Sequence, residues 1–363
     1  MMKITELYIY PIKSLAPLAV PRTRLRREGA EHDRRFMLLK TQPDGRHKLI
    51  QVSSFPECAL FRQQIDGDEI VVTYHVPSRP LVAPEPPEQR TALRVPLSPA
   101  IEDRDVVDVS MAGSSTTAYR MGDPYDTWFT ACFGYDVMLV YIGDQTRDVL
   151  AHKPSENPLW RRPRQQQGGW LAGISSYLPG MGIGYGTRED GAEQLTFNEV
   201  APFLVVSKAS LRDVSTRLPE GEAMDVRRFR PNIVVDGDPQ APGQRDLMAW
   251  EEDYWAELGV TTRRAGAEHR LALTANCGRC TSINIDYDTG RRSEGEAGIV
   301  FKKLMRDRRV DQGNKYSPIF GRYAFLAPGE ARDHDDDGIE IAVGDEVQVT
   351  KRLDSRDTWA WPD

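Results

Sequence analysis

The stretch ITELYIYPIKSL, residues 4–15, alternates apolar and polar side chains until Pro11 interrupts the pattern. Such alternation, rich in β-branched and aromatic residues, is typical of a strand. Similar short runs recur through the first hundred or so residues as RFMLLKT, KLIQV, EIVVTYHV and DVVDVSM, with turn-forming segments such as QPDG and DGDE between them. Strands this short and this numerous predict a barrel-like or sandwich-like β region with few helices.

The pattern changes at about Asp123. DPYDTWFTACFG carries apolar residues at helical spacing, which predicts a helix near 123–134 that begins at an acidic cap and stops at Gly134. Further on, FLVVSKASLRDVSTRL predicts a strand and then a short helix capped by Ser207. We therefore predict a mixed α/β, β-rich fold: a first β-rich domain over 1–145, a Gly-, Pro- and Arg-rich loop or insertion over 146–194, and a second β domain over 195–355.

Composition narrows the class of protein. The 363 residues carry a net charge of −7, which argues against nucleic acid as the main partner, because phosphate backbones require clustered cations. The four cysteines, Cys58, Cys132, Cys277 and Cys280, are too sparse for a disulfide scaffold and fit a reducing compartment. The N-terminus lacks the features of a signal peptide, and no run approaches the roughly 20 apolar residues of a membrane helix. We expect a cytoplasmic protein without a membrane span.

The sharpest chemical feature is the pair Cys277 and Cys280 in TANCGRCTSINID, residues 274–286. A structural zinc site normally needs four ligands, and no second pair is visible. A redox dithiol would precede a helix, whereas TSINID has the composition of a strand. A third possibility is that one thiolate, favoured by the neighbouring Arg279, binds a soft metal carried by an organic cofactor. Two buried structural cysteines at the start of a strand are the plain alternative, and the spacing leaves it open.

Cations and amides at the ends of predicted strands point to an anionic ligand. Lys13 and Ser14 follow the first strand in a turn where backbone N–H groups, an ammonium and a hydroxyl can meet a phosphate. Successive residues of a strand face opposite sides, so one of Arg34 and Arg35 can face a pocket. The segment RRFRPNI adds three more arginines and an amide, Arg227, Arg228, Arg230 and Asn232. Each cluster alone is more often a solvated surface, but three of them in an acidic protein favour a phosphate pocket.

Five segments in this order, ITELYIYPIKSL, HDRRFMLL, RFRPNIVV, CGRCTSINIDYDTG and SPIFGRYAF, resemble the MOSC proteins that carry an N-terminal β-barrel domain. That family includes the mitochondrial amidoxime-reducing component and the C-terminal part of molybdenum cofactor sulfurase. The resemblance implies an N-terminal MOSC-associated β-barrel-like domain over 1–145, with the helix near 123–134, and a MOSC β-barrel domain with a few helices over 195–355.

The resemblance also implies a molybdenum cofactor, molybdenum bound to a pterin, with one protein cysteine as metal ligand. The position of that ligand matches Cys280, which becomes the expected metal-binding and catalytic residue, and Cys277 becomes a neighbouring or structural residue. The positions that bind the cofactor in the family match seven further residues, which are Lys13, Ser14, Arg34, Arg230, Asn232, Arg279 and Tyr323.

The function implied by the resemblance is a molybdenum-dependent oxidoreductase that reduces N-hydroxylated compounds such as amidoximes, hydroxylamines and N-oxides. No cysteines for an iron–sulfur domain follow the MOSC unit, so we expect electrons from a separate protein, by family analogy a cytochrome b5 with its NADH-dependent reductase. We expect neither the pyridoxal phosphate domain of the sulfurase, for which the chain has no room, nor a mitochondrial address. The alternatives are a non-catalytic cofactor carrier or sulfur-relay protein that uses Cys280 as a persulfide or docking thiol, and a β-rich binding domain without metal.

Overall fold

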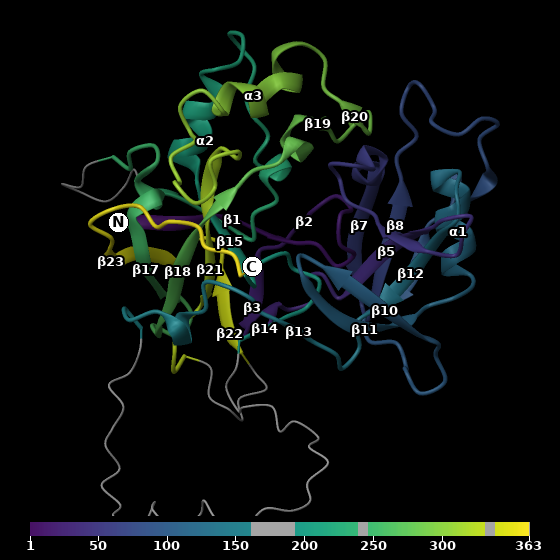
Figure 1. Cartoon of the computed structure of the whole chain (residues 1–363), viewed down its shortest axis with the longest axis horizontal. Coiled ribbons are helices and arrows are strands. Elements are labelled where there is room, and N and C mark those ends of the chain that lie inside the picture. Colours follow the sequence, from purple (N-terminus) through teal and green to yellow (C-terminus); the bar gives the residue numbers. More distant parts are fainter. Residues whose placement is uncertain (161–192, 239–245, 331–337, 363) are drawn as a thin grey trace, which may run out of the picture.

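The structure, a computed structural model, describes residues 1–160, 193–238, 246–330 and 338–362. It is rich in strands and has three α-helices within these residues, which confirms the predicted β-rich fold with few helices. Figure 1 shows two β-rich bodies side by side, with β17, β18 and β21 in one and β5, β11 and β12 in the other. Most of the predicted loop over 146–194 lies outside the described residues.

The first body is a closed barrel, because strand pairing runs from β16 through the sheet and returns from β1 to β16. The chain start is therefore part of a barrel that is otherwise built from residues beyond 200. The pairs are antiparallel except for β15 with β16, and the short β2 extends the sheet beside β1. In ring order the strands are β16 (Ile233–Gly237), β15 (Phe203–Ser207), β21 (Ile319–Leu326), β18 (Glu268–Gly278), β17 (Trp255–Thr261), β23 (Glu346–Arg352) and β1 (Met2–Ile9), with β2 at Leu18–Ala19.

The apolar pattern of β1 follows from a bulge. Its register against β16 shifts between Ile4 and Glu6, so Ile4 and Leu7, three residues apart, both join the core of the barrel. The bulge puts Tyr8 and Tyr10 into a different buried cluster, with Phe229. The strand ends at Ile9, before Pro11, which cannot donate a ladder hydrogen bond.

The second body contains a five-stranded sheet and a three-stranded sheet, and helix α1 (Tyr125–Phe133) packs with them around one apolar core. The five-stranded sheet consists of β10 (Val106–Met111), β11 (Ser114–Arg120), β12 (Val137–Tyr141), β5 (Phe36–Thr41) and β6 (His47–Leu49). The three-stranded sheet consists of β7 (Phe61–Asp66), β8 (Glu69–Tyr74) and β9 (Leu93–Pro96). The predicted boundaries at 145 and 195 stay a prediction.

Shorter elements connect and flank the two bodies. Three small sheets pair β3 (Arg22–Arg26) with β4 (Gly29–Ala30) and β22 (Ile339–Ala342), β13 (Arg147–Asp148) with β14 (Gln194–Leu195), and β19 (Ile285–Asp286) with β20 (Arg291–Arg292). The two other α-helices are α2 (Lys208–Ser215) and α3 (Val300–Leu304). The 3-10 helices are η1 (Pro56–Leu60), η2 (Pro87–Arg90), η3 (Pro154–Glu156), η4 (Val226–Phe229), η5 (Glu251–Tyr254), η6 (Thr281–Asn284) and η7 (Gly295–Ile299).

Local predictions at the helix ends have mixed outcomes. Ser207 caps α2, and its hydroxyl accepts hydrogen bonds from the N–H groups of Ala209 and Ser210, as predicted. Helix α1 ends at Gly134 in the left-handed conformation, also as predicted. Its acidic cap is wrong, because Pro124 holds the cap position and Asp123 instead accepts a hydrogen bond from the Thr127 hydroxyl at 2.6 Å.

The surroundings of the cysteine pair also differ from the prediction. The pair does not stand at the start of a strand: Cys277 lies within the last residues of β18, and Cys280 follows that strand. The expected strand over 281–286 is a single 3-10 turn, Thr281–Asn284, followed by two strand residues. The polar side chains of Ser282 and Asn284 are buried in this turn, and Asn284 accepts a hydrogen bond from the N–H of Phe301, so tertiary contacts override the apparent strand composition.

Candidate functional site

A cavity of about 330 Å³ is lined by all eight residues that the resemblance to the MOSC proteins assigns to the site. Its lining comes from the turn after β1, the segment between β4 and β5, and the segment after β6. It also comes from β15 and the segment before it, η4 and the residues after it, the end of β18 with the turn that follows, and β21. The eight predicted residues on its wall are Lys13, Ser14, Arg34, Arg230, Asn232, Arg279, Cys280 and Tyr323. Residues up to 310 positions apart in the chain thus meet in one place, and their roles as ligands stay a prediction.

Three of these residues are in a backbone conformation that side chains other than glycine seldom adopt. Ser14, Arg34 and Arg230 have φ angles of 75°, 52° and 56°. The left-handed region costs free energy for such residues, so it persists only where surrounding contacts hold it, and it is concentrated at functional sites. The three turns that carry the cations and the hydroxyl are therefore held in place by their surroundings.

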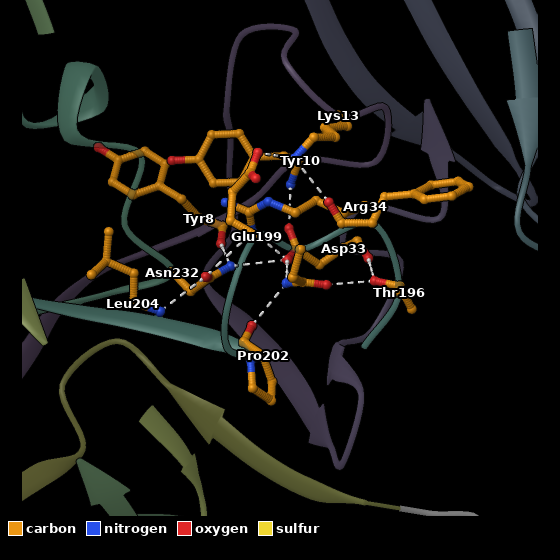
Figure 2. A network of polar contacts seen from close by, with 12 residues as sticks. Tyr8, Tyr10, Lys13, Asp33, Arg34, Thr196, Glu199, Pro202, Leu204 and Asn232 are labelled. Carbon is orange, nitrogen blue, oxygen red and sulfur yellow. Dashed lines mark hydrogen bonds and ion pairs between the residues drawn. The ribbon is translucent and has the colours of Figure 1, made fainter. Parts of the chain in front are cut away.

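Asp33 is the centre of the polar network that holds the cavity wall. Its buried carboxylate accepts hydrogen bonds from the N–H of Tyr10 at 2.7 Å and from Nη1 of Arg34 at 2.5 Å. It also accepts from the side-chain amides of Asn198 and Asn232, both at 3.2 Å. Figure 2 shows Tyr10, Arg34 and Asn232 around Asp33. Sequence reasoning missed Asp33, although it directly precedes the arginine pair, because an acidic residue next to arginines is usually exposed.

Lys13 is buried in the same wall and has one acidic partner. Its ammonium donates to the carbonyl of Phe197 at 3.0 Å and to the carboxylate of Glu199 at 2.5 Å. Burial lowers the pKa of Lys13 to about 8, although Glu199 acts to raise it. Ser14 donates its hydroxyl to the carbonyl of Ile50 at 2.8 Å. Glu199 was not predicted from the sequence, which has no pattern around it that marks a site.

The guanidinium groups of Arg34 and Arg230 share one aromatic ring. They lie 4.4 Å and 4.3 Å from the ring centre of Tyr10, where cations are attracted to the electron-rich face. Arg230 donates from Nη1 to the carbonyl of Leu15 and to the hydroxyl of Tyr287. Its Nη2 atom is buried and has no hydrogen-bond partner within the described part of the chain. Such an atom is costly unless a ligand accepts from it.

The two cysteines of the pair are held very differently. Cys277 is 3% exposed, and its sulfur accepts a hydrogen bond of 2.9 Å from Nη1 of Arg279. Nη2 of Arg279 donates to the carbonyl of Phe229 at 2.6 Å, whereas its Nε atom is buried without a partner among the described residues. Cys280 is the exposed one of the four cysteines, and its sulfur lies 3.1 Å from the hydroxyl oxygen of Ser282. The exposed cysteine is thus Cys280, the residue that the resemblance to the MOSC proteins assigns as the metal ligand.

Tyr323 lines the cavity beside the cysteine pair. Burial, reinforced by the nearby Cys277, raises the pKa of Tyr323 well above its ordinary value. The phenol therefore stays protonated across the physiological range, with Cys277 as its neighbour on the cavity wall.

The other arginines of the two predicted clusters are used elsewhere. Arg35 donates to the carbonyl of Gly143 and does not line this cavity, whereas its neighbour Arg34 does. Arg227 pairs with Asp225, and Arg228 donates to Ser293 and Asp286, so neither reaches the cavity.

The charge on the cavity wall opposes that of the whole chain. Among the described residues that line it are four cations, Lys13, Arg34, Arg230 and Arg279, and one carboxylate, Glu199. The protein as a whole has a net charge of −7. A cavity with such a surplus of cations and with orphaned N–H groups attracts an anion.

The described residues lack two further features. No group of three or more His, Cys, Asp or Glu side chains in that part of the chain is arranged to hold a metal ion. No helix in it is long and apolar enough to cross a bilayer.

The barrel and its cavity define the class: a β-barrel protein with a cationic pocket and one accessible thiol. The profile of the MOSC N-terminal beta barrel domain matches residues 1–136, and that of the MOSC domain matches residues 192–348. The chain thus contains both domains and belongs to the MOSC proteins with an N-terminal β-barrel domain.

Several curated relatives are similar over most of the chain. Human mitochondrial amidoxime-reducing component 1 is 23% identical over 95% of this chain and 82% of its own length. Rat mitochondrial amidoxime reducing component 2 is 26% identical over 88% of this chain and 78% of its own length. The molybdenum cofactor sulfurase of Neosartorya fischeri is 25% identical over 95% of this chain, but the chain spans only 40% of that protein. The relatives are thus molybdenum-cofactor-related enzymes.

Proposed function

We propose that the protein is a molybdenum-cofactor-dependent reductase of N-hydroxylated compounds, such as amidoximes, hydroxylamines and N-oxides. The observation that carries the proposal is the exposed thiol of Cys280, which opens into a cavity lined by four cations. A thiolate is a suitable ligand for a soft metal, and cations are suitable partners for a phosphate. A ligand that carries both a metal and a phosphate needs a thiolate and cations in the same cavity.

The residues present fit such a cofactor. Cys280 would be the metal ligand, and Lys13, Ser14, Arg34, Arg230 and Asn232 would bind the anionic part, with Arg279 and Tyr323 on the same wall. The buried Nη2 of Arg230 and Nε of Arg279 are donors that have no acceptor within the described part of the chain, and a bound anion would supply one. The fit therefore rests on atoms that the protein itself leaves unsatisfied.

The protein's contribution to the reaction would be binding and orientation. When bound, the cofactor supplies a redox-active metal that passes two electrons to the N–O bond of a substrate, which with two protons yields the reduced nitrogen compound and water. Tyr323, held protonated by burial, can donate a hydrogen bond within the cavity. Arg279 fixes the buried Cys277 and thereby the chain direction that leads to Cys280.

The remaining parts of the proposal concern partners and location. Electrons would come from a separate redox protein, by family analogy a cytochrome b5 with an NADH-dependent reductase, and we propose a cytoplasmic location. The names of two relatives, the mitochondrial amidoxime-reducing components, support the class of substrate. The predicted absence of a mitochondrial address stays untested.

The test is metal analysis combined with activity. Protein purified from cells that make the cofactor should hold molybdenum near one atom per chain and reduce benzamidoxime with reduced viologen as the electron source. Cys280→Ala should lose both the metal and the activity, whereas Cys277→Ala should keep bound metal and measurable reduction. Cys132→Ala, a change at a buried cysteine outside the cavity, is the matched control for the loss of a thiol.

The same experiment separates the alternative of a cofactor carrier or sulfur relay. Bound molybdenum without reduction of any N-oxygenated substrate would contradict the enzyme and favour the carrier. A Cys280 persulfide found by mass spectrometry in such a protein would favour sulfur relay. Protein without molybdenum or pterin would contradict both and leave a β-rich binding domain.

A further inference from the structure

Glu199 is the single carboxylate among the described residues that line the cavity, and it differs from the buried Asp33 beside it. Asp33 is fully buried and accepts from four donors. The side chain of Glu199 is 44% exposed, and its carboxylate contacts Lys13 and, at 3.5 Å, the amide of Gln51. One carboxylate is therefore fixed in the wall, and the other is attached to the site mainly through one ammonium.

The backbone next to Glu199 is held in place. The side-chain amide of Asn198 donates to the carbonyl of Pro202 at 3.0 Å, and Arg147 donates to the carbonyl of Asn198 at 2.8 Å. The hydroxyl of Thr196 donates to the side chain of Asn198 at 2.5 Å. Rotation of the Glu199 side chain alone, without movement of this segment, is thus enough to separate its carboxylate from Lys13.

Lys13 needs a negative partner because it is only 4% exposed. An ammonium removed from water is strongly disfavoured unless a counter-charge lies next to it. Apart from the carbonyl of Phe197, Glu199 is the acceptor that the structure shows for it. A phosphate group offers more charge and more acceptor oxygens than a carboxylate. The two would compete for the same ammonium.

We propose that Glu199 occupies the place of an anionic ligand beside Lys13, and that a phosphate group entering the cavity displaces its carboxylate. The role of this displacement in the loading of a phosphate-bearing cofactor rests on the proposed function. The ion pair between Lys13 and Glu199 thus opposes ligand binding, because a ligand must break this pair before it can bind the Lys13 ammonium. A ligand that also reaches Arg34 and Arg230 can offset this loss, whereas a small anion offsets less of it.

The test measures inorganic phosphate binding to the cofactor-free protein by calorimetry at neutral pH and low salt. Glu199→Gln removes the competing charge and should tighten phosphate binding about tenfold, the size of a typical coupling between two sites. Glu222→Gln makes the same change of net charge at an exposed residue that does not line the cavity, and should leave the affinity within about twofold. In a Lys13→Ala background the effect of Glu199→Gln should shrink, because no ammonium remains to compete for.

Equal affinity in Glu199→Gln and Glu222→Gln would overturn the proposal, as would a gain that persists undiminished without Lys13. If Lys13→Ala fails to fold in a thermal unfolding assay, the comparison of the two glutamate variants decides alone. Molybdenum content and benzamidoxime reduction are measured separately. Tighter phosphate binding in a protein that never acquires molybdenum would keep this inference and reject the proposed function.

Discussion

Two groups of residues on one cavity wall are held in different ways. The anion cluster, made of Lys13, Ser14, Arg34, Arg230 and Asn232, is tied to the fold by buried and partly buried hydrogen bonds, two of them to Asp33. In the cysteine cluster, made of Cys277, Arg279 and Cys280, the first two are buried. Cys280 is exposed, and the hydroxyl of Ser282 is the hydrogen-bonding neighbour that the described residues offer its sulfur.

The anion cluster is suited to binding, and the cysteine cluster is suited to reaction. Donors that recognise an anion work best when they are fixed before the ligand arrives, because the protein then pays less ordering entropy on binding. A thiol that must become a metal ligand needs access and few competing contacts. The comparison yields three predictions.

The largest expected effect concerns the thiols. Iodoacetamide should label Cys280 in the native protein. The buried cysteines should react only after unfolding exposes them; these are Cys58, Cys132 and Cys277. Protection by global stability corresponds to a rate ratio of about 10⁴ or more. Mass spectrometry after timed alkylation locates the label. Comparable rates at Cys277 and Cys280 would remove the contrast between the two residues of the pair.

The next effect tests how the anion cluster is held. Asp33→Ala leaves four donors without their buried acceptor and should lower the free energy of unfolding by about 3–5 kcal/mol. Urea denaturation measures the loss. Asp288→Ala is the matched control, because Asp288 is 76% exposed in its ion pair with Arg62, and should cost less than about 1 kcal/mol. A loss as small as that of the control would mean that Asp33 does not organise the cluster.

The smallest effect is a pH dependence in the anion cluster. Burial lowers the pKa of Lys13 to about 8 from 10.5, Glu199 opposes this shift, and Arg34 and Arg147 reinforce it. Phosphate binding to the cofactor-free protein should weaken as pH rises above about 8, by up to about tenfold per unit, because the ammonium is lost. Calorimetric titration between pH 7 and pH 9.5 follows this loss.

Folding stability should change in the opposite direction over the same range. Between about pH 8 and 10.5 the unfolded chain keeps a proton on Lys13 that the folded protein has released, so the contribution of Lys13 to stability rises with pH. The difference between the wild type and Lys13→Gln isolates this contribution from other groups that titrate there. A phosphate affinity that is flat across pH 8, or a difference in stability that falls with pH, would contradict the low pKa.

Much of the fold was predictable because strand patterns are local. The helix α1, the cap at Ser207 and the many short strands all follow from side-chain spacing within ten or so residues. The closure of the barrel was not predictable in this way, because Met2 pairs with Gly237 across most of the chain. The bulge in β1 also depends on that distant partner, and it puts Tyr10 beside Arg34 and Arg230.

The candidate site was predictable in its cations and its thiol, but not in its carboxylates. Lysine and arginine clusters at strand ends stand out in an acidic chain, and the resemblance to a known family added Tyr323 and the choice of Cys280. Asp33 and Glu199 look like ordinary surface acids in the sequence. In the folded protein Asp33 is buried at the centre of a hydrogen-bond network, and Glu199 pairs with the buried ammonium of Lys13.

The sequence by itself determined the supply of groups: a surplus of strand-forming segments, a few clustered cations and a pair of cysteines three residues apart. Only the tertiary structure decided that these cations share one cavity and that the two cysteines differ. Cys277 is still inside β18, whose side chains pack against neighbouring elements, whereas Cys280 lies past the strand end, where the chain turns and the residue is exposed. The reason is that exposure depends on which distant segments cover a residue, and spacing along the chain carries no information about that cover.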